Sequence, residues 1–307
     1  MDKYKNTSPG LKILFSLFAI FVAFTVTLFL SAILGMVIFK DGLINLMNQA
    51  SNFSEENITV LKYFQTVQSI GLFMIPPIII AFVYGDSIQS YLKLNVAPKT
   101  ISFILTSILL ILAMPPLINF LAEINSKMAL PVSFKGLEEW MKNMEENAAG
   151  LTELFLNTKT TGGFLFNIFM IAVLPAIGEE FMFRGVLQKQ FSDWANNNHF
   201  GIWISAFFFS AMHMQFYGFL PRLFLGVIFG YLFFWSGTIW LPVIAHFINN
   251  AIAVSAYFLI NHGKIDESFE EIGTPGNGIF TYLPISIALV ALILHQIYKQ
   301  EQQPIGT

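Results

Sequence analysis

The sequence contains no cysteine and few charged residues. Of its 307 residues, only 11% are Asp, Glu, Lys or Arg, against about 25% in an ordinary soluble domain. The absence of cysteine excludes disulfide bonds, thiol catalysis and cysteine-ligated metal sites. The net charge is −3 and the basic residues are scattered, so the chain lacks the cationic patch of a nucleic-acid-binding protein. We expect no nucleic-acid partner.

Apolar residues take the place of the missing charges. Hydrophobic residues make up 55% of the chain, 34 residues are Phe, and the mean hydropathy is +0.64. A soluble fold of this length would lack the polar residues needed to cover its surface. We therefore predict that the lipid bilayer surrounds much of this chain and that it is a multi-pass protein of the cell membrane.

Long apolar runs recur along the whole chain. A membrane-spanning helix needs about 20 mostly apolar residues, and about eight runs approach that length. The first is also longer than the apolar region of a signal peptide, which is about 7–15 residues. We expect a single all-α domain over residues 1–307, a bundle of transmembrane helices kinked at their prolines. The expected spans are Ile13–Phe39, Tyr63–Tyr84, Ile101–Ala122, Phe164–Phe183, Gly201–Phe219, Leu220–Trp235, Ile239–Ile260 and Phe280–Tyr298.

One connecting segment, Asn125–Thr161, carries apolar residues at spacings of three and four among acids and lysines. This pattern predicts an amphipathic helix, either on the membrane surface or packed as a cap on the bundle. The chain shows no internal repeat, which argues against the inverted halves common in secondary transporters.

Ionisable residues inside apolar spans are functional candidates because burying a charge there costs at least about 2.5–3.5 kcal/mol. The first group is Glu179, Glu180 and Arg184. Glu180 and Arg184 are four residues apart and can pair on one helix face. Glu179 lies about 100° around the helix and has no partner nearby in sequence, so it is a candidate general base. The alternative is a helix end at the interface, where both acids are solvated.

Two further groups lie in later spans. Phe209 precedes His213 by four residues in the expected fifth span, and His246 precedes Asn250 by four in the seventh, with Asn249 alongside. Such a histidine can also be a hydrogen-bonded core residue, and such an asparagine can simply join two helices. Together the groups place Glu, His, His and Asn at membrane depth on three helices.

The three groups resemble the motifs of the CAAX prenyl protease and bacteriocin-processing family of intramembrane endopeptidases. The family patterns are Glu-Glu-x-x-x-Arg, Phe-x-x-x-His and His-x-x-x-Asn, and this sequence has them intact at Glu179–Arg184, Phe209–His213 and His246–Asn250. The resemblance implies a catalytic core over residues 164–256. It also implies hydrolysis of a peptide bond near the C-terminus of a protein or peptide, which can carry a lipid modification.

The resemblance and the residue chemistry give the same roles. Glu179, assisted by His213, would activate a water, and His246 and Asn250 would stabilise the oxyanion. The supporting residues would be Glu180, Arg184, Phe209 and Asn249. We favour a metal-free glutamate base without a cofactor. Zinc held by Glu179, His213 and His246, as in a metalloprotease, is the alternative, although no His-Glu-x-x-His sequence occurs.

Two other functions fit the same residues. The chain could be a non-catalytic scaffold or a bacteriocin-immunity protein of the same fold, in which the polar groups hold the bundle together. It could also be a transporter that uses the Glu and His residues as a proton relay, although the lack of repeats counts against this.

Overall fold

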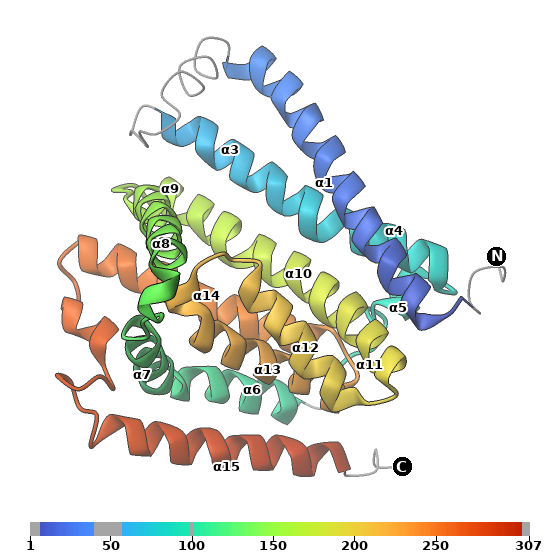
Figure 1. Ribbon diagram of the computed structural model, residues 1–307. Helices are drawn as coiled ribbons and strands as arrows, with labels where there is room; N and C mark the ends of the chain where they lie inside the picture. The colour runs from blue at the N-terminus through green and yellow to red at the C-terminus, as the bar shows by residue number, and fades with distance from the viewer. Residues whose placement is uncertain (1–6, 40–56, 99–100, 303–307) are drawn as a thin grey trace.

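The computed structural model describes residues 7–39, 57–98 and 101–302, and this part of the chain contains helices and no strands. Helices α1 and α3 form an outer layer, a long helix through α9, α10 and α11 runs beside them, and α12, α13 and α14 lie on the other side of this long helix (Figure 1). Helices α6, α7 and α15 close the opposite side. The all-α prediction is confirmed for these residues.

The helices have the following bounds. They are α1 (Pro9–Phe39), α3 (Ile58–Ser69), α4 (Ile75–Tyr84), α5 (Ile88–Tyr91), α6 (Ile101–Ala113), α7 (Pro115–Ser126), α8 (Lys135–Leu156), α9 (Thr161–Asn167), α10 (Leu174–Glu180), α11 (Lys189–Ala195), α12 (Asn198–Ala211), α13 (Phe219–Ser236), α14 (Trp240–Asn261) and α15 (Tyr282–Gln302). Short 3-10 turns occur at Val132–Phe134, Phe216–Gly218 and Glu267–Glu271, and π-helical segments at Ile70–Met74, Ile168–Val173 and Phe181–Gln188.

Six helices among the described residues are long and apolar enough to cross a membrane, and α6 with α7 makes a seventh if this pair, bent by 44°, is one span. These numbers support a multi-pass membrane protein. The six are Pro9–Phe39, Ile58–Tyr84, Thr161–Ala195, Phe216–Ser236, Trp240–Asn261 and Tyr282–Gln300.

The prediction of eight spans is therefore wrong in one place. The expected fifth span corresponds to α12, which has only 14 residues. Such a helix rises about 21 Å, less than the roughly 30 Å hydrocarbon core. It ends at Ala211, so His213 lies in the connection after the helix and not in the middle of a span.

The expected fourth span, Phe164–Phe183, is part of a continuous helix of 35 residues over Thr161–Ala195. Glu179 and Glu180 consequently lie near its middle, and both are buried. This position rules out the alternative in which a helix end exposes both acids to solvent.

Prolines alter the helices in two ways. At Pro76 and Pro175 the helix continues, and a π-helical segment comes directly before the turn that holds the proline. Since proline removes one backbone hydrogen bond, a widened turn can absorb the missing donor. At Pro115 the chain bends by 44° instead.

The outer helix α1 has small side chains on the face that packs on the bundle and large apolar side chains on its exposed face. Its buried residues are the small Ser16, Ala19, Ala23, Ser31 and Gly35. Large side chains point outward, and Phe18 and Phe21 are more than 60% exposed. Small residues allow close helix packing in a membrane, and an exposed apolar face is expected where lipid is the solvent.

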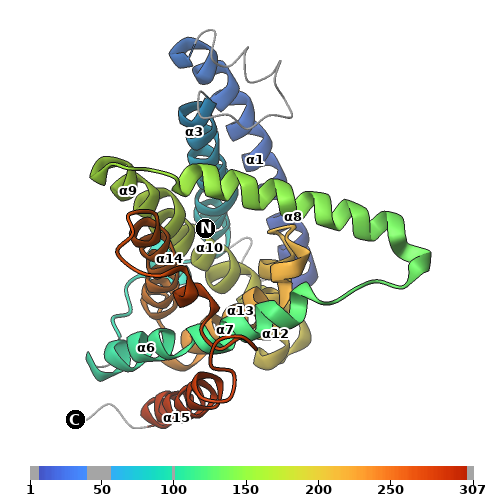
Figure 2. The ribbon, with the colours of Figure 1, turned by 90° about the vertical axis from the view of Figure 1, so that its left-hand side faces the viewer.

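Helix α8 fulfils the prediction of a helix between Asn125 and Thr161, and it runs across one end of the bundle (Figure 2). Phe155 is its buried residue, and Trp140 packs on Phe216 with ring centroids 5.4 Å apart. Leu137 remains exposed. The helix thus contacts the bundle while keeping an apolar surface free.

Candidate active site

The predicted pairing of Glu180 with Arg184 is confirmed. Arg184 Nη1 lies 2.9 Å from Glu180 Oε1, and both side chains are fully enclosed. Arg184 Nη2 donates to the carbonyl oxygen of Gly226 at 2.7 Å. The guanidinium also lies over the rings of Phe209 and Phe229, at 4.8 and 5.4 Å from their centroids. The arginine therefore joins the long helix to α13 through a hydrogen bond and a cation–π contact, and to α12 through the ring of Phe209.

Glycines on α13 allow this close approach. One turn further along the helix, Gln188 Nε2 donates to the carbonyl of Gly230 at 3.1 Å. A Cβ atom at Gly226 would lie 3.0 Å from the Cβ of Ala206 on α12, and one at Gly230 would lie 2.8 Å from Ile202. Side chains at these positions would push α12 and α13 apart, and one at Gly230 would also lie 3.0 Å from Gln188 Oε1.

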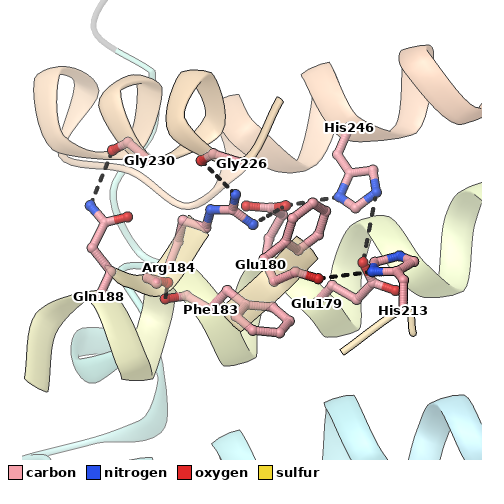
Figure 3. A network of polar contacts seen from close by, with 11 residues as sticks. Glu179, Glu180, Phe183, Arg184, Gln188, His213, Gly226, Gly230 and His246 are labelled. Atoms are coloured by element: carbon pink, nitrogen blue, oxygen red, sulfur yellow. Dashed lines mark hydrogen bonds and ion pairs between the residues drawn. The ribbon is translucent and has the colours of Figure 1, made fainter. Parts of the chain in front are cut away.

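His246 links the two glutamates (Figure 3). Its Nδ1 lies 2.8 Å from Glu180 Oε1, and its Nε2 lies 4.0 Å from Glu179 Oε2. The imidazole stacks on Phe229 at 5.0 Å, which fixes its plane. Because the Glu180 oxygen already accepts from Arg184, we assign the proton of this bond to His246 Nδ1. His246 therefore directs Nε2 towards Glu179.

Glu179 differs from its neighbour in its contacts. Its side chain is buried, with the residue 7% exposed. Its Oε2 has no hydrogen-bond partner among the described residues. Glu180 Oε2 also lacks one, but Glu180 Oε1 is held by Arg184 and His246. A buried carboxylate oxygen without a partner is costly, so the site is suited to a polar ligand such as water.

His213 and Asn250 are held by backbone carbonyls. His213 Nδ1 lies 2.8 Å from the carbonyl oxygen of Phe209. A carbonyl can only accept, so Nδ1 carries the proton and the neutral ring has its lone pair on Nε2. Asn250 Nδ2 donates to the carbonyl of Ile171 at 3.0 Å, and its Oδ1 accepts from Asn249 at 3.1 Å. One amide hydrogen of Asn250 remains for another acceptor.

A cavity of about 720 Å³ brings these residues together. Its wall includes Glu179, His213, His246 and Asn250, and Phe209 and Asn249 also line it. It does not include Glu180 or Arg184, which lie behind the wall. The predicted site residues thus lie close together. Six of them line the cavity, and Glu180 and Arg184 pack behind its wall.

The cavity also contains residues that the sequence analysis did not select. Arg222, at the start of α13, and Gln68, on α3, both line it. No short motif marks either residue. The one available signal for Arg222 was a cation within an apolar segment.

The arrangement does not fit the zinc alternative. Among residues 7–39, 57–98 and 101–302, no group of three or more His, Asp or Glu side chains is placed to hold a metal ion. The description of the protein as a metalloprotease is not supported.

Comparison with known proteins agrees with the motifs. Residues 161–252 match the family described as type II CAAX prenyl endopeptidase Rce1-like. An uncharacterized protein of Bacillus subtilis (strain 168), YpbD, is 30% identical over 110 residues, which cover 34% of this chain and 53% of YpbD. The chain thus spans about half the length of this curated relative. No solved structure matches. The family match covers the long helix, α12, α13 and the cavity-lining part of α14, and residues 161–252 are therefore an Rce1-like domain of the type II CAAX prenyl endopeptidases.

Proposed function

We propose that this chain is an endopeptidase of the cell membrane that hydrolyses a peptide bond near the C-terminus of a membrane-associated protein or peptide. The observation that carries the proposal is the buried Glu179 carboxylate. It lines a cavity shared with His213 and His246, and its Oε2 lacks a hydrogen-bond partner among the described residues. The Rce1-like match of residues 161–252 supports the same reaction class.

In this proposal Glu179 and His213 activate the water. The water binds against the Glu179 carboxylate and donates one hydrogen bond to it and the other to His213 Nε2. As the water oxygen attacks the scissile carbonyl carbon, Glu179 takes its proton, and the carbonyl π electrons move onto the oxygen. The proton then passes to the leaving amine as the C–N bond breaks. Such positioned proton transfer typically contributes about 10²–10⁴-fold to the rate.

His246 and Asn250 would stabilise the oxyanion. The free amide hydrogen of Asn250 supplies one donor. His246 would supply a second from Nε2, the ring nitrogen that faces Glu179, because Nδ1 is engaged with Glu180. Loss of one such donor typically costs about 10²–10³-fold in rate.

Glu180 and Arg184 would be positioning residues. Neither lines the cavity, but Glu180 accepts from His246 Nδ1 and Arg184 holds Glu180. Together they fix the rotation of the His246 ring and hence the direction of Nε2.

The test is to trap a substrate. Purified Glu179→Ala protein, which keeps the cavity but lacks the base, should retain peptides from a membrane extract. The wild-type protein should convert the same peptides into two fragments, whose new ends are read by mass spectrometry. Glu139→Ala, which removes an exposed glutamate on α8, is the matched control and should cleave like the wild type.

Equal cleavage by the wild type and by Glu179→Ala would contradict the proposal. Absence of cleavage by a folded wild-type protein that still binds partners would favour the scaffold or immunity function instead.

A further inference from the structure

Arg222 is the cation on the wall of the active-site cavity, and the proposed peptidase mechanism does not use it. It is the fourth residue of α13, and its side chain is partly buried. Nη1 donates to the carbonyl oxygen of Gln215 at 3.2 Å, and Nη2 donates to Gln215 Oε1 at 2.5 Å. The guanidinium therefore lies against the connection that carries His213.

Arg222 forms no close ion pair in the described part of the chain, although the carboxylates of Glu145 and Glu179 act on its charge from a greater distance. Among the residues that the structure describes, no carboxylate comes within the 4.0 Å of an ion pair. The nearby acid on α8, Glu145, is engaged elsewhere, because it accepts from the backbone N–H of Tyr217 at 3.1 Å and lies 3.5 Å from Gln215 Nε2. Gln215 thus lies between Arg222 and Glu145: it accepts from the arginine and approaches the glutamate, and the two charged groups do not contact each other.

Helix stability does not explain a cation at this position. The first turn of a helix carries a partial positive charge and favours acidic side chains over basic ones. A partly buried arginine also costs desolvation that an exposed one avoids. Glu145 and Glu179 attract the guanidinium from more than 4.0 Å without bonding to it, which leaves it able to bind an anionic group that enters the cavity.

The hydrogen-bonding capacity of Arg222 supports such binding. A guanidinium has five N–H donors in a planar fork that matches a carboxylate. The two bonds to Gln215 leave Nε–H and one hydrogen on each terminal nitrogen without a partner in the described part of the chain. A carboxylate on this free edge would complete the set and form charge-assisted bonds.

We infer that Arg222 binds the free C-terminal carboxylate of the peptide substrate and thereby selects chain ends over internal segments. The inference rests on the proposed peptidase function and adds its specificity. With the carboxylate at Arg222 and a preceding peptide bond at Glu179, both on the wall of one cavity, the enzyme would release a short C-terminal fragment.

The experiment uses a pair of random-sequence nonapeptide mixtures, one with free C-terminal carboxylates and one with C-terminal amides. Both are offered together to the full-length Glu179→Gln protein in a non-ionic detergent, and the bound peptides are counted by mass spectrometry. We expect at least about tenfold enrichment of the carboxylate form, as for a lost hydrogen bond between charged groups. The ratio should fall to near one in Glu179→Gln/Arg222→Gln. It should be intermediate with Arg222→Lys, which keeps the charge but loses the fork.

Gln215→Met in the same Glu179→Gln background separates recognition from support of the His213 connection. It removes one acceptor of Arg222 but keeps the guanidinium, so the carboxylate preference should persist. Equal binding of acid and amide, no capture of either mixture, or the same loss with Gln215→Met as with Arg222→Gln would overturn the inference. Binding is measured without turnover, so the two proposals can fail separately. If the Glu179→Gln protein prefers carboxylates but the wild-type protein never cleaves, the peptidase function is refuted and the carboxylate site is supported.

Discussion

The polar residues on the two sides of the long helix over Thr161–Ala195 differ in how completely their side chains are hydrogen-bonded. On the side facing α13, Glu180, Arg184 and Gln188 are enclosed, and Arg184 and Gln188 each donate to a backbone carbonyl of α13. On the cavity side, Glu179 is also buried, but its Oε2 has no hydrogen-bond partner among the described residues and lies 4.0 Å from His246 Nε2. The two glutamates are adjacent in sequence and about 100° apart on the helix.

In the proposed mechanism this difference separates support from reactivity on one helix. The carboxylate of Glu180 is occupied by Arg184 and His246, whereas that of Glu179 faces the cavity and can hold a water. His246 connects the sides, since one ring nitrogen contacts Glu180 and the other faces Glu179. We therefore expect substitutions on the cavity side to reduce turnover and those on the packed side to reduce stability.

The largest effect should come from the cavity side. His213→Gln removes the Nε2 acceptor that would orient the water, but it is compatible with the fold, because the hydrogen bond of the side chain to the carbonyl of Phe209 is one that Gln can replace. We expect kcat to fall by about 10²–10⁴-fold with little change in thermal stability. Cleavage of the trapped peptide and a melting curve on the same preparation test this, and wild-type kcat would refute the role of His213.

Arg184→Met should give the largest effect on the packed side. It leaves Glu180 without its arginine and the Gly226 carbonyl without a donor, and breaking such a buried pair typically costs about 3–5 kcal/mol. The free energy of unfolding in detergent should fall by about that amount. If the variant is as stable as the wild type but inactive, Arg184 acts in catalysis and the supporting role assigned to it is wrong.

Gly226→Ala tests the same side through packing alone. The new Cβ would lie 3.0 Å from the Cβ of Ala206 and within 3.2 Å of the Phe209 ring. Overpacking of this kind typically costs about 1–3 kcal/mol, so we expect a smaller loss of stability than with Arg184→Met. Gly136→Ala, at a position on α8 with open space around it, is the matched control. Equal melting temperatures for the two variants would show that α13 can shift without harm.

The smallest effect should occur on α8, outside both sides. The hydrogen bond from Lys142 lowers the pKa of Glu138. Such a pair stabilises only above the pKa that Glu138 has in the unfolded chain, and its contribution disappears as the pH falls through the folded value. Because the pair is at the surface, we expect Lys142→Met to leave stability and cleavage unchanged at pH 7. A clear loss at pH 7 would contradict the expectation that this surface pair within α8 contributes little.

The sequence predicted the contacts that depend on helical spacing. The Glu180–Arg184 pair follows from a separation of four residues, and the all-α class follows from the apolar runs. Contacts between distant segments could not be predicted this way, because the bond between His246 and Glu180 joins residues 66 apart.

The end of α12 was missed for a related reason. The apolar sequence continues through Met212 and Met214 without a glycine or proline to mark the turn, and Met214 adopts a positive φ of 54°. The orientation of Arg222 towards the cavity depends on that turn, so the sequence alone did not identify it as a site residue.

The central claim is that adjacent glutamates have separate roles, and one paired measurement tests it. Glu179→Gln and Glu180→Gln change the same atoms one residue apart, so cleavage rate and melting temperature are recorded for both. We predict that Glu179→Gln abolishes cleavage and retains the wild-type melting temperature, whereas Glu180→Gln lowers the melting temperature clearly. If Glu179→Gln cleaves normally, or if both variants lose stability alike, the division of the helix into a catalytic and a supporting side is wrong.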